Sequence, residues 1–398
     1  MTISTRSRVP VNPARLCAFN FGIQFVWGAI LAVSLQGRAS DLSGGDAARA
    51  YALIAAIGAA CATVAQLVFG ALSDRRRRQI GHRREFYLTG VALAIPALAW
   101  FYLAPSSAQL LGAFCLLQLA MNVALGAYQA AIPDYIAVER RGTASSWLSG
   151  YQSLGNAAGL LLAGFVHDLR IVASTLALGL GGSLAVAWTQ LVAPARAAEP
   201  PAVSIKPGRA LGVLLLSRGL INVGFFTLLG FLLFFVRESL GVAEPAVRTQ
   251  SALLFLSFTL AAVAGAAIAA RPTDRYDKRL VVTIACLVIA CALAGLATAH
   301  SLPVAYGAAL VAGAAWGAFV GADWALAAVV LPPGSIAGAF AVWNVATTVP
   351  QILAPIAALP LVERFNARAA GLGPRAAIVL SLLEFLAGGA LIWLLPRL

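Results

Sequence analysis

Long apolar segments alternate along this chain with short hydrophilic connections, and this alternation limits what the chain can fold into. The most hydrophilic connection is Gly70–Glu85, read as GALSDRRRRQIGHRRE, which holds Asp74 and six arginines between two apolar segments. Such a run is too polar for hydrocarbon, whereas about 20 apolar residues span a bilayer as a helix. The sequence therefore predicts a multi-span membrane protein in which Gly70–Glu85 is a short loop with Gly81 in a tight turn.

The composition supports this class and excludes others. The 398 residues are 61% hydrophobic and only 11% charged, which is more apolar than a soluble domain. A net charge of +13 could indicate nucleic-acid binding. We exclude that partner because the basic residues lie in short loops between apolar runs, the pattern of membrane proteins. The five cysteines lack metal-ligand spacing and the three histidines lie at loops or span ends, so we expect no metal and no cofactor.

On a ruler of about 20 residues per span we expect twelve helices. Their expected ranges are 14–36, 48–72, 86–104, 108–132, 144–166, 171–194, 210–236, 249–270, 280–299, 303–330, 336–360 and 375–396. An even number places both termini on one side. Of the 28 Lys and Arg residues, 19 fall on the terminal side, 8 on the opposite side and one, Arg218, inside a span. The positive-inside rule therefore predicts cytoplasmic termini.

The chain divides into two related halves. The segment 195–209 is the longest polar connection on the terminal side, and it separates residues 1–194 from residues 210–398, each with six expected helices. Short motifs repeat at an offset of about 200 residues: Asp74-Arg75 with Asp274-Arg275, Asn20-x-Gly22 with Asn222-x-Gly224, and Gly126-Ala-Tyr128-Gln129 with Gly321-Ala-Asp323-Trp324. Such a repeat is typical of transporters that rock around a site near the membrane midplane.

Several stretches resemble a known family. Gly70-x-x-Ser73-Asp74-Arg75-x5-Gly81-x-Arg83-Arg84 resembles the loop 2–3 motif of the major facilitator superfamily. Phe21–Gln36, Tyr128–Trp147 and Gly321–Pro355 resemble the corresponding regions of its glycoside and sucrose:proton symporter branch, in particular the short bacterial members. The resemblance implies an all-α fold of two six-helix bundles in the cytoplasmic membrane of a bacterium. The sequence departs from that branch at Ser34-Leu35-Gln36, where plant members have Pro-Tyr, and at Val329, where an acid is common.

The resemblance implies that helices 1, 4, 7 and 10 line a cavity, with helices 5 and 11 behind them. Uncharged polar and aromatic residues recur at helical spacing on these helices. The candidate substrate-binding residues are Asn20, Gln24, Trp27, Gln118, Asn122, Tyr128, Gln129, Gln152, Asn156, Asn222, Trp324, Asn344, Thr348 and Gln351. Amides bind hydroxyl groups in both directions and ring faces stack on sugars, so the set favours a neutral polyhydroxylated ligand. Alternatively, the same side chains hold helix to helix.

Three ionisable residues lie within expected spans: Arg218, Asp323 and Glu384. Charges at this depth cost roughly 2.5–3.5 kcal/mol each on insertion scales and usually serve a function. Arg218 and Asp323 lie about 13 and 10 Å from the cytoplasmic ends of their helices, so they can pair. We expect Asp323 to carry the proton and Arg218 to hold it ionised. The alternative is a permanent structural pair or gate lock, and Glu384 is a second candidate carrier or a structural residue.

The charged loops form a candidate gate at the cytoplasmic face. Its expected members are Asp74, Arg75, Arg83, Arg84, Asp134, Arg141, Asp274 and Arg275. Asp74 can pair with nearby arginines or face the start of helix 11, where Ser335 is a candidate cap. Asp274 and Arg275 can do the same against helix 5 near Thr143. Arg76–Arg78 are expected to be a solvated run that sets topology and contacts anionic lipid.

These features favour one function and leave two alternatives. The chain lacks a GxxxxGK[ST] loop and a nucleophile–base pair, so we expect secondary transport rather than ATP-driven transport or enzymatic activity. The leading function is proton-coupled uptake of a sugar or glycoside by a monomer. The first alternative is a proton-driven exporter of a small amphipathic compound. The second is a membrane scaffold or sensor that transports nothing.

Overall fold

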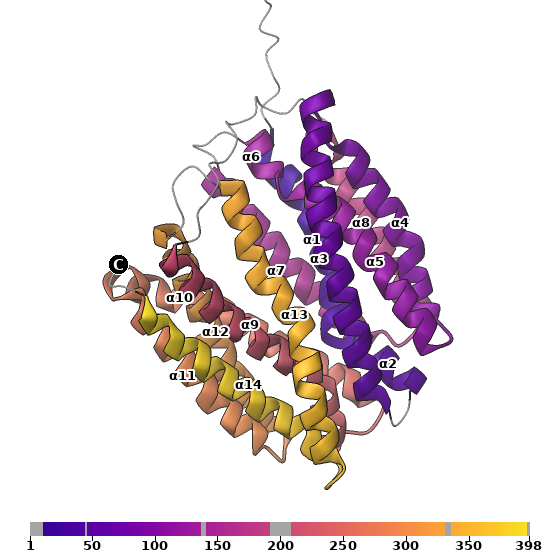
Figure 1. The fold of residues 1–398 in the computed structure, drawn as a ribbon. Coiled ribbons are helices and arrows are strands. Elements are labelled where there is room, and N and C mark those ends of the chain that lie inside the picture. Colours follow the sequence, from indigo (N-terminus) through magenta and orange to yellow (C-terminus); the bar gives the residue numbers. More distant parts are fainter. Residues whose placement is uncertain (1–10, 44–45, 137–140, 192–207, 331–335, 396–398) are drawn as a thin grey trace, which may run out of the picture.

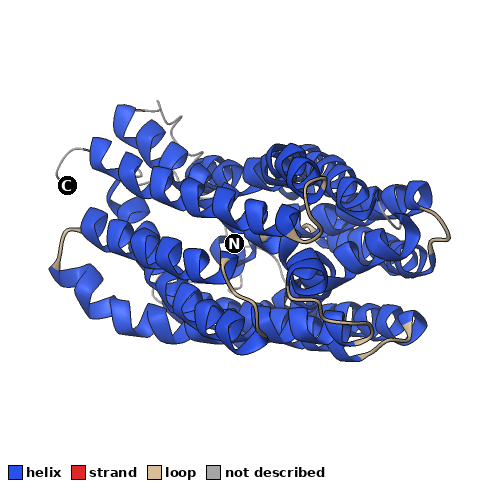
Figure 2. Cartoon of the chain, turned by 90° about the horizontal axis from the view of Figure 1, so that it is seen from below, coloured by secondary structure: helices blue, strands red, loops and turns tan. Residues whose placement is uncertain are grey.

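The structure is a computed structural model that describes residues 11–43, 46–136, 141–191, 208–330 and 336–395. All regular structure within these ranges is helical (Figure 2). Twelve long helical segments account for most of it. Eleven of them are long and apolar enough to cross a membrane. The twelfth, α7 (Arg141–Phe165), has 25 residues and carries the polar residues Ser149, Gln152 and Asn156 near its middle.

The first six segments precede residue 192 and the other six follow residue 207. The first set comprises α1 (Pro13–Ala29) with the π-helical η1 (Ile30–Ser34) and α2 (Leu35–Ser43), then α3 (Ala47–Ile80), α4 (Arg84–Leu103), α5 (Ser107–Tyr128), the short α6 (Ala131–Tyr135), α7 and α8 (Leu169–Leu191). The second set comprises α9 (Arg209–Phe234) with the π-helical η4 (Phe235–Ser239), α10 (Ala246–Arg275), α11 (Lys278–Ala297), α12 (Leu302–Val330), α13 (Ile336–Asn366) and α14 (Leu372–Leu391) with η5 (Ile392–Leu394). We call these sets the N-half and the C-half.

The two ends of the helix bundle differ and need names. The linker end is where α1 begins, α8 ends and α9 begins, and the far end is the opposite one, where α2 and η4 end. The α6 helix and the start of α13 also lie at the linker end (Figure 1). Toward this end most helices of the C-half lean away from those of the N-half (Figure 1).

The predicted loop at Gly70–Glu85 is mostly helical, which corrects the sequence-based expectation. The α3 helix continues to Ile80, and the turn contains only residues 81–83. Gly81 does occupy the predicted tight turn, since its φ is +80° and its N–H donates to the Arg77 carbonyl at 2.8 Å. The helix outlasts the apolar segment because arginine is a good helix former and leaving hydrocarbon does not end a hydrogen-bond ladder. For the same reason α10 includes Asp274 and Arg275, and α13 passes the predicted end at residue 360.

Close helix packing depends on small residues at two helix pairs. A Cβ on Gly28 of α1 would overlap the backbone of Asn156 on α7, and a Cβ on Gly317 of α12 would overlap the backbone of Ala262 on α10. Small residues allow such approach between membrane helices. The α7 helix also packs on α10, and α13 packs on α3 as well as on α9. The α7 and α13 helices therefore lie along the seam between the halves.

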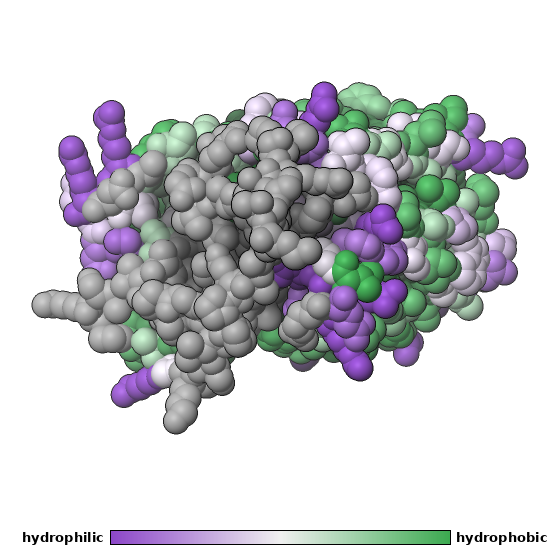
Figure 3. Space-filling model, turned by 90° about the horizontal axis from the view of Figure 1, so that it is seen from above, coloured by the Kyte–Doolittle hydropathy of each residue, from purple (hydrophilic) through white to green (hydrophobic). Residues whose placement is uncertain are grey.

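The outer surface is strongly apolar. Large hydrophobic side chains stand exposed on several helices, including Leu178 on α8 at 76% and Ile268 on α10 at 75%. Seen from the linker end, hydrophilic side chains gather on that face and apolar side chains flank it (Figure 3). Exposed apolar area on this scale suits contact with lipid rather than water.

Candidate functional site

An ion pair is buried inside the C-half. The guanidinium of Arg218 on α9 donates a hydrogen bond to Oδ2 of Asp323 on α12, and its Nη2 lies 3.2 Å from Oγ1 of Thr347 on α13. Asp323 is only 2% exposed and the side chain of Arg218 is 12% exposed. The predicted pairing of Arg218 and Asp323 is thus confirmed, and Thr347 is a partner that the sequence analysis did not single out in this role.

Arg218 and Asp323 lie at similar depths on two different helices. Arg218 is nine residues after the start of α9 and Asp323 is seven residues before the end of α12, so both lie about 10–14 Å from the linker end. A buried ion pair has few other solvation partners, and removing one member leaves an uncompensated charge. Each of the three partners comes from a different helix. A relative movement of α9, α12 and α13 would therefore separate the carboxylate from its cation.

Several candidate binding residues are buried and bonded to backbone. Asn20 donates to the Leu148 carbonyl at 3.0 Å, which ties α1 to α7, and Tyr128 donates to the Leu16 carbonyl at 3.1 Å. Asn122 and Asn222 donate to carbonyls four residues earlier in their own helices. Buried members of the set are Asn20, Gln118, Asn122, Tyr128 and Asn222, each 5% exposed or less. In this conformation the contacts of Asn20 and Tyr128 match helix-to-helix adhesion, whereas those of Asn122 and Asn222 stay within one helix.

Other candidates are accessible. Gln24, Trp27, Asn156, Thr348 and Gln351 are half-buried, and Gln129 and Gln152 are exposed. Gln24 lies against Gly155, at the contact between α1 and α7. The side chains of Trp324 and Asn344 lie outside the described part of the chain. The accessible residues belong chiefly to α1, α7 and α13, and two of these helices border the seam between the halves.

Glu384, the third ionisable residue within a span, faces a hydroxyl group rather than a cation. It is half-buried on α14 and faces Thr227 of α9. Within the described ranges neither its buried Oε2 nor the fully buried Thr227 hydroxyl has a hydrogen-bond partner. Its predicted role, as second carrier or structural residue, stays a prediction. The described residues contain no group of three His, Cys, Asp or Glu side chains that could hold a metal ion.

A cluster of charged side chains surrounds Arg83 at the linker end of the N-half. Its Nη2 lies 2.6 Å from Asp74 Oδ1 and its Nε lies 2.9 Å from Asp134 Oδ2, and Nη1 donates to the Ser73 hydroxyl at 2.7 Å. Arg77 adds a second cation to Asp134 at 3.1 Å. The side chain of Arg83 is only 3% exposed. The cluster therefore joins α3, the 81–83 turn and α6.

Burial and the neighbouring charges shift the pKa values of Asp134 and Arg83 in opposite directions. Burial raises the pKa of Asp134 above its ordinary value, and the guanidiniums of Arg83 and Arg77 offset that rise only in part. Burial by itself would lower the pKa of Arg83, but the carboxylates of Asp134 and Asp74 outweigh it, so the pKa is raised. Arg83 therefore stays charged throughout the physiological range.

The sequence predicted part of this cluster. Asp74, Arg83 and Asp134 were expected in one layer, and the structure brings them together. Arg77 was expected to be solvated, which is wrong, because the continuing α3 helix places it one turn after Ser73 and Asp74 on the same face. Arg75, Arg84 and Arg275 are exposed. The side chains of Arg141 and Asp274, and all of Ser335, lie outside the described residues.

Hydrogen bonds join the two halves at the far end, and sequence reasoning missed them. Gln36 is fully buried, and its amide donates to the Leu229 carbonyl at 2.8 Å and accepts from the Leu233 N–H at 3.0 Å. Leu229 and Leu233 are one helical turn apart in α9. Asp41 pairs with Arg248 at 2.5 Å, and the Thr249 hydroxyl donates to the Gly164 carbonyl. Every hydrogen bond found between the halves in the described ranges lies at this end.

Comparisons with known proteins agree on the class. Two structures of a bacterial homolog of the human lysosomal transporter Spinster, both inward-facing, align with TM-scores of 0.74 and 0.77 at 16% and 15% identity. They cover 96% of this chain and 96% and 95% of theirs. A mutant of the nucleoside transporter NupG aligns with a TM-score of 0.71 at 14% identity, covering 96% of this chain and 100% of that one. These likenesses show the fold.

The search among curated proteins found no match. The family model described as Major Facilitator Superfamily, in contrast, matches residues 16–355, which is most of the chain. The chain therefore belongs to the Major Facilitator Superfamily, and it is a membrane transporter.

Proposed function

We propose that this protein is a secondary active transporter that couples proton entry to uptake of a sugar or glycoside across the cytoplasmic membrane of a bacterium. In this proposal the halves 1–194 and 210–398 are the two moving bodies, joined by the cytoplasmic linker 195–209. The protein acts as a monomer by alternating access. The exposed Arg75, Arg76 and Arg84 at the linker end contact anionic lipid.

The charge distribution gives the proposed orientation. The excess of Lys and Arg on the side of the termini places the linker end in the cytoplasm. The hydrogen bonds between the halves lie at the far end, which would then face the exterior. The conformation described above is accordingly the inward-open state of the cycle.

The observation that carries proton coupling is the buried Arg218–Asp323 pair. Intramembrane carboxylates in transporters commonly serve as proton relays, because a charge there is costly unless paired or protonated. Arg218 holds Asp323 ionised in the inward-open state. When the C-half rearranges, loss of the guanidinium favours the protonated carboxyl.

Neutral polar side chains support the proposed substrate class. Gln24, Gln152 and Thr347 each lie eleven residues after the start of α1, α7 and α13, so all three are about 16 Å from the linker end. This depth is close to that of the ion pair. Amides and hydroxyls at one depth suit the hydroxyl groups of a sugar. The structural likeness to a nucleoside transporter makes nucleosides, which are N-glycosides, natural members of a test panel.

One observation favours the alternative, export of a small amphipathic compound. A cavity inside the C-half has an almost wholly apolar lining that includes Phe225, Phe255, Phe258 and Leu296. The ring of Phe225 stacks on Trp316 with centroids 4.5 Å apart. Such a lining would hold an apolar group better than a sugar.

A ligand panel separates these proposals. Purified protein would be heated with monosaccharides, disaccharides, nucleosides and lipophilic cations, and its melting temperature recorded. Stabilisation by a glycoside, followed by alkalinisation of the external medium when that glycoside is added to vesicles, supports symport. Stabilisation only by lipophilic cations supports export. A glycoside that is transported without moving protons would overturn the coupling.

A further inference from the structure

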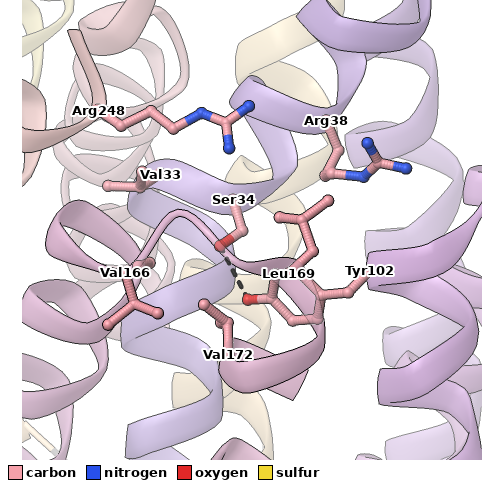
Figure 4. Close-up of a pocket in the computed structure, with 9 residues that line it drawn as sticks. Val33, Ser34, Arg38, Tyr102, Val166, Leu169, Val172 and Arg248 are labelled. Atoms are coloured by element: carbon pink, nitrogen blue, oxygen red, sulfur yellow. Dashed lines mark hydrogen bonds between the residues drawn. The ribbon is translucent and has the colours of Figure 1, made fainter. Parts of the chain in front are cut away.

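A small cavity lies at the far end, where the N-half meets the C-half (Figure 4). Its lining includes Ser34, Arg38 and Tyr102 from the N-half and Arg248 from α10 of the C-half. The cavity volume of about 10 Å³ is room for roughly one water molecule, and a chloride ion is only slightly larger. The arginines lie above the hydrogen bond that Tyr102 donates to Ser34 at 2.8 Å (Figure 4).

The charges around the cavity are unbalanced. Arg38 Nη1 and Arg248 Nη2 approach the same oxygen, Asp41 Oδ2, at 3.5 and 2.5 Å. In the described ranges neither arginine forms an ion pair with any other acid. Arginine stays protonated in proteins, so two cations share one carboxylate. The site carries an excess positive charge.

The cavity also holds donors in want of an acceptor. Arg38 is 8% exposed, and its Nε has no hydrogen-bond partner among the described residues. A buried donor without an acceptor destabilises the fold, and more so when it is charged. The Ser34 hydroxyl accepts from Tyr102, and its own proton is free for another acceptor. A water molecule would satisfy these donors but would leave the charge uncompensated.

We propose that a halide-sized anion, chloride under physiological conditions, binds in this cavity between Arg38 and Arg248. Nothing in the proposed proton or substrate site requires it, since Arg218 and Asp323 lie toward the other end of their helices. Because Arg38 belongs to the N-half and Arg248 to the C-half, the anion joins the halves where Asp41 already pairs with Arg248. An opening of the far end would separate the two cations and dismantle the site. Chloride therefore stabilises the conformation that is closed at the far end.

Thermal unfolding of the purified full-length protein tests this site. Sodium chloride would be compared with sodium gluconate at equal ionic strength, because gluconate is too large for the cavity. We expect a saturable rise of about 2 °C or more with chloride. Arg38→Gln should abolish the rise. Arg237→Gln is the matched control, since Arg237 is another far-end arginine but pairs with Glu244 inside the C-half, and it should retain the rise.

A second measurement keeps the proposal testable if Arg38→Gln fails to fold, since Arg38 also donates to the Ala104 carbonyl. Wild-type crystals grown in bromide should show an anomalous peak between Arg38 and Arg248. Equal melting temperatures in chloride and gluconate would overturn the proposal. So would a chloride effect that Arg38→Gln retains, or a bromide peak that is absent from the cavity.

Discussion

At equivalent positions of the sequence repeat, the N-half has a neutral hydrogen bond and the C-half has an ion pair. Leu16 and Arg218 each precede the repeated Asn-x-Gly motif by four residues, and Tyr128 and Asp323 share the third place of the repeated Gly-Ala-x motif. In the N-half Tyr128 donates to the Leu16 carbonyl, a neutral contact. In the C-half the corresponding contact is the Arg218–Asp323 ion pair. The repeat therefore preserved the contact between the two helices but changed its chemistry.

The difference suggests a division of labour. A hydroxyl bonded to a backbone carbonyl has no charge state to change near neutral pH, so it can only hold α1 and α5 together. A carboxylate bonded to a guanidinium can be protonated when the two separate. The N-half instead places its buried charges at the linker end, around Arg83 and Asp134. We therefore assign proton coupling to the C-half interior and gating to the N-half rim, as proposals.

The largest expected effect comes from breaking the C-half contact. Arg218→Gln leaves Asp323 as an unpaired buried charge, which should lower the free energy of unfolding by about 3–5 kcal/mol. Tyr128→Phe, its counterpart in the N-half, should cost only about 1 kcal/mol. Denaturant unfolding in detergent measures both. The double variant Arg218→Gln/Asp323→Asn should recover much of the loss, and equal small costs for both single variants would contradict the asymmetry.

A smaller effect is expected at the N-half rim. Asp134→Asn removes a carboxylate that serves Arg83 and Arg77, so we expect a loss of about 2–3 kcal/mol in unfolding free energy. Asp74 is 54% exposed, and Asp74→Ala should cost under about 1 kcal/mol. As a gate residue, Asp74 should affect the transport rate more than ligand affinity. Rates in vesicles and binding by calorimetry would separate these, and an unchanged rate would remove Asp74 from the gate.

The smallest effect on folding is expected at Gln36. Gln36→Leu keeps a side chain of similar volume, and the Leu229 carbonyl and Leu233 N–H are an i→i−4 pair within the continuous α9 helix, so folding should barely change. The halves lose two hydrogen bonds, so the closed far end should weaken by about 1–2 kcal/mol, roughly tenfold in the conformational equilibrium. Spin labels at Ala108→Cys and Ser301→Cys, in a chain without its five native cysteines, report the far-end distance. An unchanged distance distribution would show that Gln36 does not hold the far end closed.

Sequence patterns predicted some of these features for physical reasons. Apolar length accounts for eleven of the twelve expected helices, all but α7. Equal depth predicted the Arg218–Asp323 pairing, because the rise per residue is constant in a helix. The end of α3 was missed because hydropathy marks the membrane boundary and not the end of the helix. Gln36 was missed because a single amide has no periodicity, and its partners lie nearly 200 residues away. The pairing of Arg77 with Asp134 was missed for the same reason as the end of α3, because it requires α3 to continue past Asp74.

Proton-driven accumulation tests the central claim most directly. Vesicles containing Asp323→Asn or Tyr128→Phe would receive an imposed pH gradient and the substrate identified by the ligand panel. We predict that Asp323→Asn shows no accumulation above equilibrium yet retains counterflow exchange, whereas Tyr128→Phe accumulates substrate as the wild type does. Accumulation by Asp323→Asn at the wild-type level would contradict the assignment of proton coupling to this ion pair.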